Sequence, residues 1–232
     1  MYIVNQLEAA GPLLWVLALL SVYVLYVFFW RLQVLSGLRQ NPETLLKRAF
    51  EALSQGDLGG AVREASRLRI PASNVLRAGL GRFGAGVEAS RAAMNEALLV
   101  EEDRLFKGLS GLGTVAQIAP LFGLLGTVFG MIRAFTVFAH ISTPTAAQLA
   151  GGISEALFNT AGGLIVAITA YAARNYLRTR AEGALLDAER VVESLPSWLR
   201  DAKNHHPELD FGLEDGKSIQ AEGGNGNPEF LI

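Results

Sequence analysis

Among the polar side chains inside long apolar segments of this sequence, three are candidates for a functional role. Glu155 and Thr160 belong to GGISEALFNTAGGLIVAI at 151–168, and Thr127 belongs to APLFGLLGTVFGMI at 119–132. An ionised carboxylate among apolar residues is costly in a membrane, and it usually faces a partner or a water-filled cavity. We therefore expect Glu155 to face a partner or a water-filled cavity.

Each of these side chains also has a purely structural explanation. Glu155 would then lie at a helix mouth as a cap or in a salt bridge, but its position a few residues inside the apolar segment favours a functional role. Asn159, four residues further on, is a candidate hydrogen-bond partner for it. A threonine hydroxyl in a helix can bond to its own backbone carbonyl, so Thr127 by itself does not indicate a pore.

Small residues recur at helical spacing in both segments. They are Gly113, Ala116, Pro120, Gly123, Thr127 and Ala134 in the first, and Ala156, Thr160, Gly163 and Ala167 in the second. Such stripes allow membrane helices to pack closely, so packing and pore lining are both open for the glycines. Glu155 and Thr160 are about 140° apart on an ideal helix and need not face one lumen, whereas Thr127 and Thr160 can.

Three apolar segments are long enough to hold these residues in a bilayer, since a spanning helix needs about 20 apolar residues. We expect them at 12–30, 109–139 and 149–176, in a chain that is 50% hydrophobic and 18% charged. The first has no charge and carries aromatic residues near both ends, and we expect it to be a lipid-facing anchor. Arg133 is the one charge in the second, where we expect it to snorkel to the interface, with pairing to an acidic residue as the alternative.

The basic residues predict the orientation. Twelve of the 20 Lys and Arg residues lie in 31–108 and seven lie from Arg174 onward, which leaves Arg133 alone. By the positive-inside rule, 31–108 and 177–204 are then cytoplasmic, while 1–11 and the loop 140–148 are periplasmic. The chain would be a multi-pass protein of a bacterial inner membrane.

The cytoplasmic parts have helical patterns. Leu45, Ala49 and Leu53 follow a helical repeat, Asp57–Gly60 reads as a break, 61–68 as a short helix, and Ile70–Pro71 as its end. The charged amphipathic stretch 88–107 leads directly into the second span, which predicts one continuous helix there. A further helix is expected at 177–204, and the Gly-, Asn- and acid-rich tail 205–232 is expected to be disordered.

The composition argues against several other classes of function. Without cysteine there is no disulfide framework, thiolate zinc site or cysteine nucleophile, and the three histidines have no metal-site spacing. No metal or other cofactor is therefore expected, and His140 reads as a surface residue. The net charge of −2 argues against a nucleic-acid partner. The sequence offers no nucleophile–base pair and no nucleotide loop, so we do not expect an enzyme.

The two motifs, at 119–132 and 151–168, resemble the second- and third-helix signatures of the MotA/TolQ/ExbB proton channel family, in its ExbB/TolQ branch. Their order, their spacing and the three-span plan match over roughly residues 10–195. The resemblance implies an all-α membrane protein that assembles as a homo-oligomeric ring, a pentamer, around a partner with a single span and a transmembrane aspartate, similar to ExbD or TolR. Protons would pass between that aspartate and the polar residues of the ring.

The resemblance also implies roles for particular residues. By motif position Thr127, Thr160 and Glu155 match the family's pore residues, and Pro120 matches its second-helix proline. We assign Gly123, Gly126, Gly130, Asn159 and Gly163 to supporting positions, for pore lining or packing. Arg133 departs from the family pattern, where an uncharged polar residue or histidine is expected.

The expected function is that of an ExbB-like subunit, which would use the proton-motive force to energise a TonB-type outer-membrane transport system, with a TonB- or TolA-like protein as a further partner. A TolQ-like envelope-maintenance subunit or a gliding-motility subunit is the close alternative. A membrane scaffold without ion conduction is the alternative of another class. A permease with its own substrate site ranks lowest, because no inverted repeat or second buried charge is evident.

Overall fold

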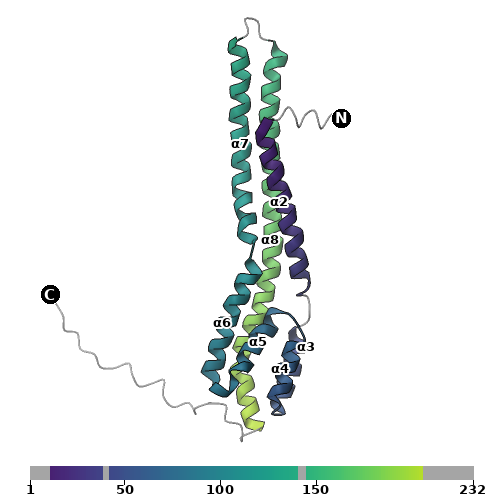
Figure 1. Ribbon diagram of the computed structural model, residues 1–232, viewed down its shortest axis with the longest axis vertical. Coiled ribbons are helices and arrows are strands. Elements are labelled where there is room, and N and C mark those ends of the chain that lie inside the picture. The colour runs from purple at the N-terminus through teal and green to yellow at the C-terminus, as the bar shows by residue number, and fades with distance from the viewer. Residues whose placement is uncertain (1–10, 39–41, 141–144, 206–232) are drawn as a thin grey trace, which may run out of the picture. The chain divides into compact units, whose positions relative to one another are not determined.

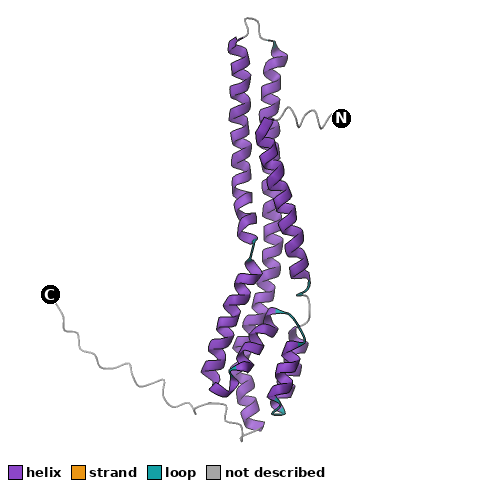
Figure 2. Ribbon diagram, viewed as in Figure 1, coloured by secondary structure: helices purple, strands orange, loops and turns teal. Residues whose placement is uncertain are grey.

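The computed structural model describes residues 11–38, 42–140 and 145–205, and within these ranges regular structure is helical throughout (Figure 2). Part of the predicted periplasmic segments, 1–10 and 141–144, and the predicted tail from 206 onward lie outside the described residues. The chain forms two units. The first comprises Met1–Gln40 and Val100–Leu186, and the second comprises Asn41–Leu99 and Asp187–Ile232.

Three long helices build the first unit. They are α2 (Gly11–Ser36), α7 (Leu109–His140) and the larger part of α8 (Ala146–His205), and they lie alongside one another (Figure 1). The described part of the chain has three helical segments that are long and apolar enough to cross a membrane, within Leu13–Ser36, Val87–Val137 and Ala150–Ser194. The prediction of an all-helical chain with three candidate spans is therefore confirmed.

Helix α2 has one buried side and one exposed apolar side. Leu17, Val24 and Arg31 recur every seven residues and are buried. Leu17 and Val24, with Val27 and Leu35, belong to a buried cluster that includes residues of α7 and α8. The other side exposes large apolar residues: Trp15, Leu19, Val22, Tyr26 and Phe29. An apolar surface of this kind is favourable when lipid covers it.

The predicted continuous helix from 88 into the second span is wrong. Helix α6 (Val87–Phe106) ends before α7 begins, and Gly108 between them has φ +81°, in the left-handed region that glycine adopts without steric cost. The guanidinium of Arg31 donates to the carbonyls of Arg104, at 3.1 Å, and Leu105. Last-turn carbonyls lack helical partners, and a cation there is favourable. The break is thus capped by a residue from another helix.

Helix α8 is longer than either segment predicted for it. The predicted span 149–176 and the predicted helix 177–204 are parts of this single helix, with no interruption between them. The residues at 177–181 continue the buried face of the span, since Leu177 and Ala181 are fully buried. The helix therefore extends the same packing surface beyond the apolar segment.

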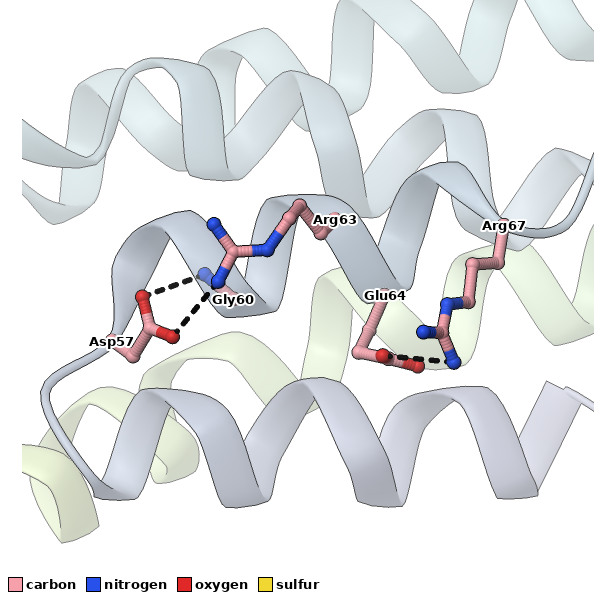
Figure 3. A network of polar contacts seen from close by, with 5 residues as sticks. All are labelled: Asp57, Gly60, Arg63, Glu64 and Arg67. Carbon is pink, nitrogen blue, oxygen red and sulfur yellow. Dashed lines mark hydrogen bonds and ion pairs between the residues drawn. The ribbon is translucent and has the colours of Figure 1, made fainter.

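The second unit contains the short helices α3 (Pro42–Ser54), α4 (Leu58–Ser66), α5 (Pro71–Gly81) and the 3-10 turn η1 (Phe83–Ala85). The predicted break at 57–60 lies slightly earlier, because Gly56 has φ +75° and α4 begins at Leu58. Asp57 caps this helix by accepting from the backbone N–H of Gly60 at 2.7 Å, and Arg63 pairs with it at 3.2 Å (Figure 3). A side chain at Gly60 would collide with that carboxylate.

The predicted end at Ile70–Pro71 is the start of a helix that the sequence analysis did not anticipate. Proline suits a first helical turn because its missing N–H has no helical partner there. The Ser73 hydroxyl in the first turn of α5 donates to the carbonyl of Leu68 at 2.7 Å. Val75, Leu76 and Met94 are fully buried in this unit.

Candidate functional site

Helices α7 and α8 run in opposite directions (Figure 1). They touch through their glycines. A Cβ atom on Gly163 would lie 2.7 Å from the carbonyl oxygen of Ala119 and 2.9 Å from the Cα of Gly123. A Cβ atom on Gly130 would lie 2.9 Å from the carbonyl oxygen of Gly152. The two backbones are thus in direct contact, so these glycines serve close packing within one chain.

The packed face of α7 is rotated from the predicted small-residue stripe. Residues in contact with α8 or fully buried follow a spacing of three or four: Ala119, Gly123, Gly126, Gly130 and Ala134. Pro120 and Thr127, which the prediction placed within the stripe, are half-buried at the edge of this face. Gly113, which it also included, receives the side chain of Arg174 from α8.

The structure brings the two threonines to the same side of the α7–α8 contact. Thr127 follows Gly123 by four residues, and Thr160 follows Ala156 by four, so each is turned about 40° in the same sense from its packed face. In an antiparallel pair, equal rotations place side chains on one side of the interface. The Thr160 hydroxyl donates across to the carbonyl of Gly123, at 3.4 Å, whereas that of Thr127 donates to its own-helix carbonyl of Leu124, at 2.6 Å.

Glu155 lies on the other side of the contact. It precedes Ala156 by one residue and is therefore turned about 100° in the opposite sense. Its carboxylate Oε2 is 3.1 Å from Nη1 of Arg133 on α7, and the carboxylate side chain is 7% exposed while that of Arg133 is 54% exposed. The structure therefore shows the alternative that we gave for Arg133, an ion pair with an acidic residue, and not the expected extension to the interface. Within one chain the structure does not bring Glu155 to the threonines.

Asn159 is buried at the same side of the contact as Glu155. It is 1% exposed, and its side chain fills the space beside Gly126, where an added Cβ would collide with it. A residue larger than glycine at 126 would displace this amide. The hydrogen bond expected between Asn159 and Glu155 stays a prediction.

Two arginines that bury polar atoms were not predicted from the sequence. Arg31 was read as the first basic residue after the first span, but it continues the seven-residue repeat of Leu17 and Val24, and this repeat could have placed it on the buried face. Arg174 was read as the first basic residue after the third span. Its Nε is buried without a hydrogen-bond partner and lies against Gly113.

An open groove of about 680 Å³ runs along the C-terminal part of α7. It is lined by Thr127, Val128, Met131, Ile132, Phe135, Thr136, Ala139 and His140. The predicted surface position of His140 is confirmed, since it is exposed. Among the residues the structure describes, no three His, Cys, Asp or Glu side chains gather to hold a metal ion.

Comparison with known proteins relates the chain to one family. The sequence model of the MotA/TolQ/ExbB proton channel family matches residues 68–190. The chain is 34% identical over 163 residues to the Tol-Pal system protein TolQ of Pseudomonas aeruginosa, covering 62% of this chain and 71% of that protein. It is 31% identical over 179 residues to a putative biopolymer transport protein, ExbB-like 1, of Synechocystis, covering 72% and 67%. A putative ExbB homolog of Methanothermobacter thermautotrophicus is 24% identical over 197 residues, covering 84% and 70%.

Proposed function

The chain belongs to the MotA/TolQ/ExbB proton channel family, and we propose that it is the ring-forming subunit of an inner-membrane motor that draws on the proton-motive force. The observation that carries this proposal is the α7–α8 pair. The largely apolar segments of the two helices, which pack closely through glycines, hold two threonines on one side of their contact and an ion-paired glutamate on the other.

Such an arrangement is incomplete in a single chain. Polar groups on apolar helices are favourable only when they face other polar surfaces. The side with Thr127 and Thr160 has half-exposed positions that no other described residue of the first unit covers. Five copies around a single-span partner with a transmembrane aspartate would supply the missing surface. The electrical part of the proton-motive force would then provide about 2.3 kcal/mol per charge per 100 mV.

The process that the motor drives is proposed as TonB-type outer-membrane transport, by an ExbB-like subunit working with an ExbD-like partner. Relatives named ExbB and a relative named TolQ both match well, so a TolQ-like role in envelope maintenance is the alternative. In either case the N-terminus would be periplasmic and the C-terminus cytoplasmic, which the distribution of basic residues supports.

Complementation of a gene deletion tests the proposal. Loss of the gene is expected to abolish either energised uptake or envelope integrity, and the wild-type gene restores it. Thr127→Ala, Thr160→Ala and Glu155→Ala are expected to fail at normal protein levels. A wild-type phenotype for all three variants would contradict the assignment. It would favour a membrane scaffold whose spanning helices pack together without conducting ions. Gly183→Ala is the matched control, since a Cβ at this exposed position on α8 meets nothing within 4 Å.

A further inference from the structure

The two members of the Arg133–Glu155 pair differ in their surroundings. The Glu155 side chain is 7% exposed and lies on α8 beside the contact with α7. The Arg133 side chain is 54% exposed and extends from α7 to the carboxylate. A long arginine side chain can extend its charge toward water at a membrane surface. Of the two, Arg133 is the group that can move away, and the carboxylate stays in place.

The pair is isolated from other charges in the described helices around it. On α7 the only other charged or histidine side chain is His140, seven residues further on and exposed, and the N-terminal part of α8, 146–168, contains no charge besides Glu155. The described part of α2 has no charge before Arg31. No other lysine or arginine among these residues is available to replace Arg133.

We propose that Arg133 is a positioning residue that keeps Glu155 as a carboxylate and controls when it takes up a proton. This inference rests on the proposed function. With Arg133 in place the pair is neutral overall. When its guanidinium moves away, a buried carboxylate loses its counter-charge, which is unfavourable. Oε2 then accepts a proton from water on the outer side, and the charge of the pair rises by one. Transfer of that proton to the next acceptor restores the carboxylate, and Arg133 binds it again.

Arg133→Gln tests this in the purified complex with its native partner, reconstituted in vesicles that contain a pH-sensitive dye. Without the cation the carboxyl retains its proton, so we expect proton flux at neutral pH to fall about tenfold and to recover about one pH unit higher. Arg133→Lys keeps the charge and is expected to stay near wild type. Arg178→Gln is the matched control, because it breaks an ion pair within α8 between side chains that are 49% and 44% exposed.

The charge exchange Arg133→Glu with Glu155→Arg distinguishes control of Glu155 protonation from a role in holding α7 and α8 together. It is expected to restore the thermal stability that Arg133→Gln loses, but not the flux, because the carboxylate is then on α7. Infrared spectra should show a protonated carboxylic acid in Arg133→Gln at neutral pH that is absent in Arg133→Gln with Glu155→Gln. Wild-type flux and pH profile in Arg133→Gln, or full flux in the exchanged variant, would overturn the inference while leaving the proposed function in place. If the wild-type complex carries no flux above empty vesicles, both fail.

Discussion

Arg31 is a charged residue with a structural role. Its guanidinium is buried and donates to the carbonyls of Arg104 and Leu105, next to the interruption at Gly108. Those carbonyls end a helix and have no partner within it. The residue therefore joins α2 to the end of α6, a contact between positions more than seventy residues apart in sequence.

Arg31→Met should lower the free energy of unfolding by about 2 kcal/mol, because hydrogen bonds from a charged donor are lost and the carbonyls stay buried. Thermal unfolding of the detergent-purified protein measures this. Arg178→Met, at an exposed position, should cost less than about 0.5 kcal/mol. Equal losses in the two variants would show that the buried contact of Arg31 contributes nothing specific.

Residue type alone does not determine the hydrogen-bond partners of the two threonine hydroxyls. Both motifs contain a central threonine, but Thr127 satisfies its hydroxyl within α7 and Thr160 reaches across to the carbonyl of Gly123 at a long 3.4 Å. Neither bond is strong enough to fix the helix pair, since such bonds in membranes average about 0.6 kcal/mol. Their value in the proposed channel lies in the hydroxyls that they place on one side of the contact.

At the level of helices, the glycines decide how closely α7 and α8 approach. Gly163→Ala should destabilise the pair by about 1–3 kcal/mol, because the added methyl would lie 2.7 Å from the Ala119 carbonyl oxygen and 2.9 Å from the Gly123 Cα, where backbone cannot yield easily. Gly183→Ala, with open space around it, should be neutral or stabilising by up to about 1 kcal/mol. Melting temperatures of the two purified variants provide the comparison, and changes of the same sign would contradict this packing.

The existence of the long helices was largely predictable from the sequence, but the residues at which helices begin and end were not. Long apolar segments indicate candidate membrane-spanning helices, because a helix needs about 20 apolar residues to cross a bilayer. The interruption at Gly108 was missed because charged and apolar helical patterns run through it without a change of period. Pro71 was interpreted as the end of a helix, although proline is also favourable in the first turn of a helix. Both errors come from local signals whose meaning depends on tertiary contacts.

The candidate site was predictable in its residues and not in its arrangement. Motif position identified Thr127, Thr160 and Glu155, but the pairing of Arg133 with Glu155 joins two residues 22 positions apart and depends on the register of α7 against α8. That register is fixed by glycine contacts such as Gly130 with Gly152, which no single-helix pattern reveals. A small-residue stripe alone does not tell whether it faces the same chain or a neighbour.

For the whole molecule, the function proposed here is shared among chains. The first unit holds the candidate spans and every proposed pore residue, while the second unit is built from short helices with their own buried side chains. Helices α6 and α8 contribute to both units, so each unit has a covalent helical connection to the other. In the proposed ring, the candidate spans of several chains would together carry the protons.

The most direct measurement is proton flux through the purified complex with its native partner, reconstituted in vesicles under an imposed membrane potential. Wild type should acidify or alkalinise the vesicle interior well above empty vesicles, in the direction of the potential. Glu155→Gln, which keeps the size of the side chain but cannot carry a proton, should fall to the empty-vesicle level, with Gly183→Ala retaining wild-type flux. Flux in Glu155→Gln equal to that of wild type, or no wild-type flux above empty vesicles, would contradict the account.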